Sequence, residues 1–436
     1  MKIISFIFAL VLCLDSVLSY SGYQVLRVSV DNERHAAQLD KLQRNGDYDF
    51  WSNFIVIGKH VDVMASPQRL PSLHQWLSDN GMTWSVMVAD VESLIQLEKI
   101  PAGNSSSKTD SRHSMDWTSY HPIEEIYGWF DYLETTYDFC QTESIGQTYE
   151  GEQMIVMKVC KGGCGNKPIM WIDSGIHARE WIAPAVGTWM LNELVENDAA
   201  HPELTEKLDW YFLPSHNPDG YHRSQTVDRM WRKTTTQYDG NACMGTDANR
   251  NWDYHWADAG ASSDSCSQTY QGPEAFSEVE ARNVRDYVMA HKDQIKFYQT
   301  LHSYSQLVLF PWGYTSDPAP GYDAMLDLGT RGNEALFAVH NKYYEVGCIP
   351  CVLYTASGTS LDWALGVAGI PYVYSIELRD TGTYGNIETL SDLFAGIVMF
   401  RVPATAVGDY PQRRGDLGLP RGGRSADHTG VWPGLS

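Results

Sequence analysis

The feature that most limits the folds open to this chain lies beyond residue 112, where short apolar runs alternate with longer segments of helical periodicity. The apolar runs span 168–173, 208–213, 296–301 and 370–376, and the helical segments span 180–195, 278–291, 324–344 and 388–400. Buried strands separated by helices are typical of parallel sheets that are covered on both sides. The pattern therefore predicts an α/β unit with a mixed, mostly parallel sheet and helices on both faces.

Residues 20–100 follow a different pattern, in which short strands alternate with amphipathic helices. Extended segments are expected at 23–30, 54–57 and 61–64, and helices at 34–43, 70–77 and 91–97. This predicts a separate α+β unit of about 80 residues. The next segment, 101–112, is rich in Gly, Ser and Pro and has no apolar period, so we expect an exposed linker. Within it, Asn104 begins a sequence motif for glycosylation.

Residues 1–19 have the features of a secretory signal peptide: Lys2, an apolar run at 3–14 and small residues before a cleavage site near Ser19. A membrane-spanning helix needs about 20 apolar residues, so this run is too short for an anchor. No later stretch is long and apolar enough either. We therefore expect a secreted, extracellular protein with no membrane attachment.

The composition limits the partners that this chain can have. It is 43% hydrophobic and 20% charged over 436 residues, which is typical of a globular protein with two folded units. It carries 54 acidic and 32 basic residues, giving a formal net charge of −22. Such a surface repels phosphate backbones, so we expect no binding of nucleic acid. The Arg-rich tail, 413–436, is expected to be disordered.

Seven of the eight cysteines lie beyond the signal peptide, because Cys13 belongs to it. In an oxidising compartment most of them should pair. A Cys243–Cys266 bond would close a mid-sized loop, whereas Cys348 with Cys351, and Cys160 with Cys164, would close short ones. The odd count leaves one thiol over, and spacing does not say which one. No further cysteine pair stands at a spacing that would make Cys348 and Cys351 part of a zinc ribbon.

Side chains with metal-binding and acid–base chemistry follow three of the apolar runs. His177 and Glu180 come just after the first run, His302 directly follows the third and Glu377 directly follows the fourth. Ligands of open α/β sheets bind beyond the carboxyl ends of the strands, so these side chains should meet on one rim. Two histidines and one glutamate form a catalytic zinc set that leaves the fourth position for water.

The His-x-x-Glu pair alone is a weak signal. Short motifs occur by chance, and Glu180 could simply favour the positive end of a helix dipole at the helix start. His302 makes the zinc site the favoured interpretation over a plain helix start, because it would come from a separate strand of the same sheet.

Longer motifs carry a family resemblance. They are GIHAREW at 175–181, NPDGY at 217–221, WRK at 231–233, DANRNW at 247–252, LHSYSQ at 301–306 and ELRD at 377–380. With these motifs the chain resembles the pancreatic-type metallocarboxypeptidases of the A/B family, which are secreted zinc exopeptidases made as proenzymes. The resemblance covers most of 113–410 and, more loosely, 20–112.

The resemblance implies roles for individual residues. His177, Glu180 and His302 match the ligands of one Zn²⁺ ion per chain. Glu377 matches the general base that takes a proton from a zinc-activated water and later gives it to the leaving amine. Arg232 matches the arginine that stabilises the oxyanion.

The same resemblance implies a substrate site for peptide and protein C-termini. Asn249 and Arg250 match the anchor of the terminal carboxylate, and Tyr354 matches the tyrosine that closes over the substrate. Residues that contact the peptide upstream of the scissile bond are matched by Arg179, Ser303 and Tyr304. Leu361 takes the place that sets specificity, and Ile349, Leu309 and Ala356 add apolar walls. A buried cation would be costly beside Leu361, so an A-like preference for aromatic and aliphatic C-terminal residues is expected.

The implied domain organisation is a signal peptide at 1–19, an activation pro-segment at 20–112 with its linker at 101–112, a zinc carboxypeptidase catalytic domain at 113–412 and the tail. A trypsin-like protease would cleave the linker, after Arg112 or otherwise Lys108, and release the catalytic domain as a monomer. Cys243 and Cys266 are expected to be disulfide-bonded.

Two other classes of function compete with this one. A catalytically dead binding protein on the same fold would have lost a ligand or the glutamate, and all four positions are intact. A zinc amidase acting on small acyl-amino acids is disfavoured by the pro-segment and by the complete carboxylate anchor.

Overall fold

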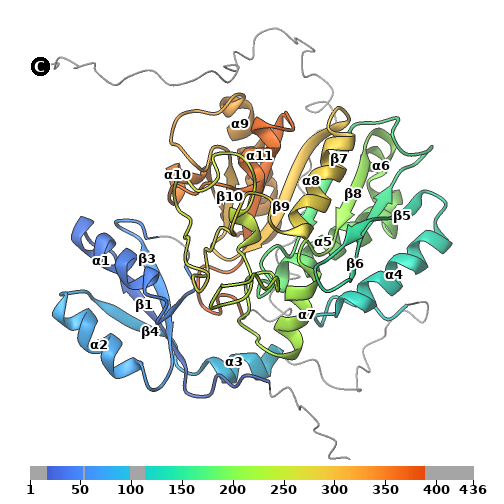
Figure 1. Cartoon of the computed structure of the whole chain (residues 1–436). Helices are drawn as coiled ribbons and strands as arrows, with labels where there is room; N and C mark the ends of the chain where they lie inside the picture. Colours follow the sequence, from blue (N-terminus) through green and yellow to red (C-terminus); the bar gives the residue numbers. More distant parts are fainter. Residues whose placement is uncertain (1–16, 53–54, 99–112, 388–436) are drawn as a thin grey trace, which may run out of the picture.

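The structure is a computed structural model that describes residues 17–52, 55–98 and 113–387. The predicted signal peptide up to residue 16, the linker 101–112, the helix at 388–400 and the tail lie outside the described residues. The described part forms two units, which we call the N-terminal unit (17–98) and the C-terminal unit (113–387); they lie against each other in Figure 1. None of the helices described is both long and apolar enough to cross a membrane.

The N-terminal unit is a four-stranded antiparallel sheet with two helices on one face. Its elements are β1 (Gln24–Ser29), α1 (Glu33–Arg44), β2 (Asp49–Phe50), β3 (His60–Ala65), α2 (Leu70–Asp79), β4 (Trp84–Val88) and α3 (Val91–Glu98). Helix α1 begins where the Asn32 side chain accepts a hydrogen bond from the His35 N–H at 3.0 Å. The strand order is β2-β3-β1-β4.

The two faces of this small sheet have different partners because strand side chains alternate. Leu26 and Val28 pack with apolar residues of α1 and α2 in the unit's own core. Val25 and Met64 face the other way and pack with α3 and with residues of the C-terminal unit, among them Tyr304. The extended segment expected at 54–57 is wrong for the described residues 55–57, which form an irregular segment and a turn. Gly58, with φ +83°, supports that turn, which no Cβ-bearing residue adopts easily.

The C-terminal unit is built on an eight-stranded mixed sheet in the order β11-β10-β12-β9-β7-β8-β6-β5. The central strands β12, β9, β7 and β8 are parallel to one another, and antiparallel strands extend the sheet on both sides. The strands are β5 (Cys140–Gln147), β6 (Gln153–Val159), β7 (Ile169–Ser174), β8 (Asp209–Leu213), β9 (Ile295–Ser303), β10 (Leu307–Phe310), β11 (Glu345–Cys348) and β12 (Tyr372–Leu378). The predicted mixed, mostly parallel sheet is confirmed.

Helices cover both faces of this sheet, as predicted (Figure 1). They are α4 (Ile123–Thr136), α5 (Ile182–Val195), α6 (Pro202–Lys207), α7 (Pro218–Thr226), α8 (Val279–His291), α9 (Tyr322–His340), α10 (Ile349–Val352) and α11 (Ser360–Gly366), with 3₁₀ turns η1 (Asp198–Ala200) and η2 (Ala248–Arg250). Met170 and Ile172 of β7 share a core with α4, α5 and α9. Ile169 and Trp171 share the opposite core with α8 and α11.

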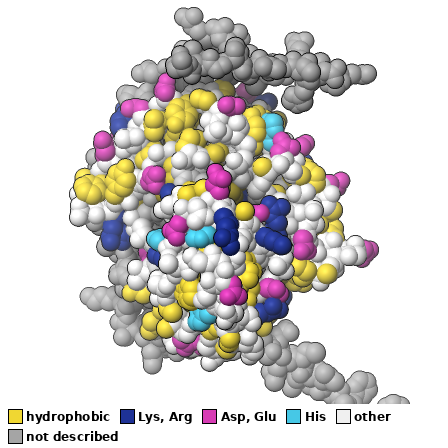
Figure 2. All heavy atoms as spheres, turned by 90° about the vertical axis from the view of Figure 1, so that its left-hand side faces the viewer, with side chains coloured by type: hydrophobic (Ala, Val, Ile, Leu, Met, Phe, Trp, Pro, Cys, Tyr) yellow, Lys and Arg dark blue, Asp and Glu magenta, His cyan; other side chains and the backbone are white. Residues whose placement is uncertain are grey.

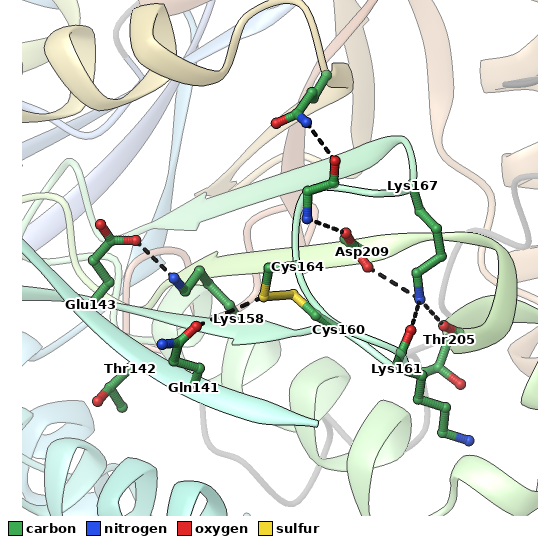
Figure 3. Close-up of a disulfide and its surroundings, with 12 residues drawn as sticks. Gln141, Thr142, Glu143, Lys158, Cys160, Lys161, Cys164, Lys167, Thr205 and Asp209 are labelled. Carbon is green, nitrogen blue, oxygen red and sulfur yellow. Dashed lines mark hydrogen bonds and ion pairs between the residues drawn. A yellow bond between two sulfur atoms is a disulfide. The ribbon is translucent and has the colours of Figure 1, made fainter. Parts of the chain in front are cut away.

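Three disulfides lie in the described part of the C-terminal unit: Cys160–Cys164, Cys243–Cys266 and Cys348–Cys351. The first closes the short loop between β6 and β7, which Figure 3 shows next to the Lys167–Asp209 ion pair at 3.1 Å. Among the described cysteines Cys140 alone is unpaired, and burial raises its pKa to about 12.

A buried carboxyl group in α8 makes the stability of the fold depend on pH. Glu280 is fully buried, and its Oε1 accepts a hydrogen bond from the Tyr149 N–H at 2.9 Å. Its Oε2 has no hydrogen-bond partner among the described residues. Burial raises the pKa of Glu280 from 4.5 to about 7, so the folded chain binds this proton more tightly than the unfolded chain does. The stability that comes from the protonated group is present below the ordinary pKa and is lost as the pH rises through 7.

We predict that Glu280→Gln removes this loss, because glutamine keeps the acceptor and cannot ionise. Between about pH 4 and pH 8, the free energy of unfolding of the wild type should fall relative to that of the variant by up to about 3 kcal/mol. Denaturant unfolding at a series of pH values measures the difference. Glu274→Gln, at an exposed position, is the control. Parallel stability curves for the wild type and E280Q would contradict the prediction.

Candidate metal centre and substrate site

Three buried side chains bring nitrogen and oxygen atoms together where β7 and β9 end. The Nδ1 of His177 lies 2.8 Å from Oε1 of Glu180, and the Nδ1 of His302 lies 3.2 Å from Oε2 of the same glutamate. The two Nδ1 atoms are 3.2 Å apart. Among the described residues, this is the one group of His, Cys, Asp or Glu whose ligand atoms all lie within 4.8 Å of one another.

Parallel strand pairing positions these residues. Strand β9 lies between β7 and β12, with Ser174 in register with Leu301 and Glu377 in register with His302. His177 and Glu180 lie in the turn between β7 and α5. That turn begins at Gly175, where φ is +67° and an added Cβ would lie 3.3 Å from the Ser215 backbone.

Two further charged residues, Asp247 and Arg232, lie next to the cluster. Nε2 of His177 lies 3.1 Å from Asp247, whose other oxygen accepts a hydrogen bond from Arg232 at 2.7 Å. Arg232 also lies 3.7 Å from Glu180. Burial opposes ionisation of both carboxyl groups, but Arg232 holds the pKa of Asp247 well below its usual range, and the two histidines hold that of Glu180 below its own. Asp247 was not assigned a role from the sequence, although it lies within the DANRNW motif.

The donor set fits zinc. Two imidazole nitrogens and a carboxylate are ligands that Zn²⁺ takes in catalytic sites, and both Nδ1 atoms face the glutamate. The carboxylate behind His177 is the kind of outer partner that orients a zinc-binding imidazole. His177, Glu180 and His302 are therefore the residues that would hold the ion.

Glu377 lies next to this cluster and belongs to β12. It lies in register with His302, one residue before the end of the strand. Burial raises the pKa of Glu377 to about 7, and nearby Glu180 acts in the same direction. A carboxyl group with a pKa near neutral can both take and return a proton at physiological pH.

The residues matched to the carboxylate anchor also come together. Nη2 of Arg250 donates to the Tyr354 hydroxyl at 2.5 Å, and the Asn249 side chain accepts from the Ser360 N–H at 3.0 Å. Leu361, next along α11, is buried. The neighbouring Asp362 carboxylate is turned away, because it accepts hydrogen bonds from the backbone N–H groups of residues 313 and 314.

The residues matched to upstream contacts face the N-terminal unit. Arg179 forms an ion pair with Asp49 at 2.9 Å, and the Tyr304 hydroxyl donates to Asp62 at 2.7 Å. The Ser303 N–H donates to Glu180 at 3.2 Å. Two of the three residues are thus occupied by acidic side chains of the N-terminal unit.

A further ion pair joins the end of the N-terminal unit to the same region. Arg229 donates to both oxygens of Glu98, at 2.6 and 2.8 Å, and its guanidinium lies 3.8 Å from the centre of the Trp181 ring. Both partners are almost fully buried. Sequence reasoning missed Asp49, Asp62 and Glu98, because a single acidic residue carries no pattern that reveals a distant partner.

The outer surface of the molecule on this side is mixed in charge. Figure 2, which views the molecule from the side of the N-terminal unit, shows acidic and basic side chains interspersed over this face. The contacts that join the two units lie inside and include the Arg179–Asp49 and Arg229–Glu98 ion pairs beside the apolar cluster that contains Tyr304.

Comparison with known proteins agrees with this geometry. Residues 126–404 match the family model described as zinc carboxypeptidase, and residues 26–98 match the one described as carboxypeptidase activation peptide. The chain therefore belongs to the zinc carboxypeptidase family, and the resemblance found in the sequence is confirmed. It is a metallocarboxypeptidase, a peptide hydrolase with an N-terminal activation peptide.

Named relatives include both A-type and B-type enzymes. Carboxypeptidase B of Astacus astacus is 49% identical over 273 residues, which are 62% of this chain and 90% of the relative. Human carboxypeptidase A1 is 36% identical over 380 residues, which are 86% of this chain and 90% of the relative. Among solved structures, that of thrombin activatable fibrinolysis inhibitor has a TM-score of 0.78 at 32% identity, covering 88% of this chain and 96% of that one. Carboxypeptidase A from Helicoverpa armigera has a TM-score of 0.80 at 26% identity, covering 89% and 97%.

Proposed function

We propose that this chain is a secreted, monomeric zinc carboxypeptidase, made as a proenzyme, that removes aromatic and aliphatic residues from peptide C-termini. The observation that carries the proposal is the convergence of His177, Glu180 and His302 with Glu377 at one end of the sheet. The proposed carboxylate anchor at Arg250 supports an exopeptidase rather than an endopeptidase.

The chemistry follows from the side chains around the cluster. His177, Glu180 and His302 would hold the zinc ion, which when bound would supply polarisation of the scissile carbonyl and a lowered pKa for the attacking water. Glu377 takes the proton from that water and delivers it to the nitrogen of the leaving residue. Arg232 has its Nη1 buried with no hydrogen-bond partner among the described residues, so it can donate to the carbonyl oxygen as negative charge develops there.

We assign substrate orientation to the residues of the proposed carboxylate anchor. Arg250 and Asn249 bind the terminal carboxylate, and Tyr354 closes over the substrate. The hydrogen bond from Arg250 to Tyr354 shows that the two side chains can reach each other without movement of the backbone. Arg179, Ser303 and Tyr304 contact the residues upstream of the scissile bond.

We predict that Glu377→Gln and His302→Ala produce different defects, because base and ligand are different residues. E377Q should keep zinc and lose at least 10²-fold in kcat, since general base catalysis contributes about 10²–10⁴-fold. H302A should lose the metal. Metal analysis and peptide hydrolysis on the same purified proteins measure both effects. An E377Q enzyme that loses less than about 10-fold, or an H302A chain that holds zinc normally, would contradict the assignment.

Specificity rests on the buried apolar side chain of Leu361. Family membership does not decide it, because named relatives include A-type and B-type enzymes. Asp362, the nearest acidic residue in sequence, has its carboxylate bound to backbone N–H groups and offers no free counter-charge. An unpaired cation in such a pocket would cost several kcal/mol.

We predict a preference for C-terminal Phe, Tyr, Leu or Ile over Lys or Arg of at least ~100-fold in kcat/KM, which requires about 2.7 kcal/mol. Paired N-blocked dipeptides ending in Phe and Arg, compared at moderate salt, measure the ratio. Leu361→Asp should shift the ratio toward Arg, and Leu361→Ile is the matched control that should not. Equal or better turnover of the Arg substrate by the wild type would refute the A-like assignment and leave the zinc mechanism intact.

The N-terminal unit is assigned an inhibitory role. Asp49 and Asp62 occupy Arg179 and Tyr304, two of the side chains proposed to contact substrate. Substrate cannot use those groups while the contacts persist. The Glu98–Arg229 pair holds the end of the unit close by, directly before the linker.

We predict that trypsin activates the intact chain by cutting the linker, after Arg112 or otherwise Lys108. Trypsin should reach this linker, because proteases cut exposed, unpatterned segments. Hydrolysis of a blocked peptide should then rise by at least ~10-fold. N-terminal sequencing locates the cut. A chain with Arg112→Gln and Lys108→Gln is the control and should resist activation. Full activity with residues 20–112 still attached would contradict the inhibitory role.

A further inference from the structure

The two histidines of the cluster differ in what lies behind them. His177 has Asp247 at 3.1 Å from its Nε2. The Nε2 of His302 is buried and has no hydrogen-bond partner in the part of the chain that the structure describes. Its Nδ1 faces Glu180 and His177, so when that atom binds a metal the Nε2 carries a proton and needs an acceptor. Zinc-binding imidazoles almost always have such an outer partner.

Other unpartnered polar groups gather on the same side of the sheet. Side chains alternate between the two faces of a strand. Asp173 therefore lies on the same face of β7 as Trp171, and His302 lies on the same face of β9 as Thr300 and Tyr298. The rings of Trp171 and Tyr298 stack on each other, so these side chains share one face of the sheet. The Oδ2 of Asp173 accepts from the Trp171 indole at 2.7 Å. Its Oδ1 is buried and has no partner among the described residues.

His216 completes this group. It follows β8, and its backbone N–H donates to the Ser174 carbonyl at 2.8 Å, which ties it to the end of β7. The side chain is fully buried with its ring 5.9 Å from that of Trp252, and neither ring nitrogen has a hydrogen-bond partner among the described residues. Burial lowers the pKa of His216 to about 4, and the charges of Asp173 and His302 also act on it.

A neutral imidazole in this place has one donor and one acceptor to satisfy. Each buried polar atom without a partner costs about 1–3 kcal/mol, and such atoms in folded proteins are usually bonded to protein or to ordered water. A buried water forms about three hydrogen bonds to groups of this kind. His302 supplies a donor, Asp173 supplies an acceptor and His216 supplies one or the other, so their chemistry fits a single water molecule.

We propose that His216 and Asp173 hold a buried water that accepts the hydrogen bond from Nε2 of His302. This inference rests on the proposed zinc site and adds a positioning residue to it. The water would fix the orientation of the His302 ring and the location of its proton, as Asp247 does directly for His177. The two ligands would then be supported differently, one by a carboxylate and the other through water.

The test separates this role from simple packing against Trp252. His216→Phe keeps an aromatic ring and removes both nitrogens, whereas His216→Gln keeps a donor and an acceptor. Zinc affinity of the full chain is measured by competition with a chelator, and thermal unfolding is measured on the metal-free proteins. We expect H216F to bind zinc at least 10-fold more weakly, which is the effect typical of a lost outer partner, and H216Q to bind within about 3-fold of the wild type.

A stability measurement and a control variant distinguish a loss of zinc binding from a loss of folding. Metal-free H216F should unfold no more easily than the wild type, because phenylalanine keeps a ring that packs on Trp252 and needs no buried hydrogen-bond partner. His291→Phe, at a partly buried ring packed on Tyr211 and Tyr287, is the control and should leave zinc affinity unchanged.

A crystal structure of the zinc-loaded wild type should show a water about 2.7–3.2 Å from both His302 Nε2 and His216, which tests the proposal without any variant. Zinc affinity of H216F within 2-fold of the wild type, or no water at that place, would overturn the inference and leave the zinc site standing. A wild type that binds no zinc would overturn the proposed function as well.

Discussion

The parallel pairing of β9 with β7 on one side and with β12 on the other is the constraint on which the rest of the structure depends. Parallel strands end at the same edge, so residues far apart in the chain meet there. The pairing sets Glu377 in register with His302 and brings the turn that carries His177 and Glu180 beside them. The apolar strand positions supply the rigidity that the proposed chemistry needs.

The site concentrates buried charge, which is tolerable where opposite charges lie in contact. Asp247 connects His177 to Arg232, and Arg232 in turn lies near Glu180. Acidic side chains of the N-terminal unit also pair with buried arginines, namely Arg179 and Arg229 at the edge of the same region. In our proposal, activation replaces those contacts with contacts to the substrate, so the same groups serve inhibition and binding.

Much of this architecture could be predicted from the sequence. The apolar runs became β7, β8, β9 and β12, and the candidate ligands stood where those runs ended, because burial of both sheet faces leaves a strong pattern. Individual partners left no such pattern. Tertiary packing decides these partners, and no local sequence pattern encodes it. Examples are the ion pairs of Asp49 and Glu98, the contact of Asp247 with His177, and the ring nitrogens of His216 that have no partner among the described residues. The turn at residues 55–57 was missed because the periodicity of so short an apolar run does not identify its structure.

The central claim is that a single zinc ion is held by His177, Glu180 and His302 in the intact chain. The most direct measurement is anomalous scattering at the zinc absorption edge from crystals of the purified, uncleaved protein. We expect one peak per chain, about 2.0–2.2 Å from the Nδ1 atoms of both histidines and from a Glu180 oxygen. A peak at another site, or no peak in protein that hydrolyses C-terminal peptide bonds after cleavage, would contradict the account.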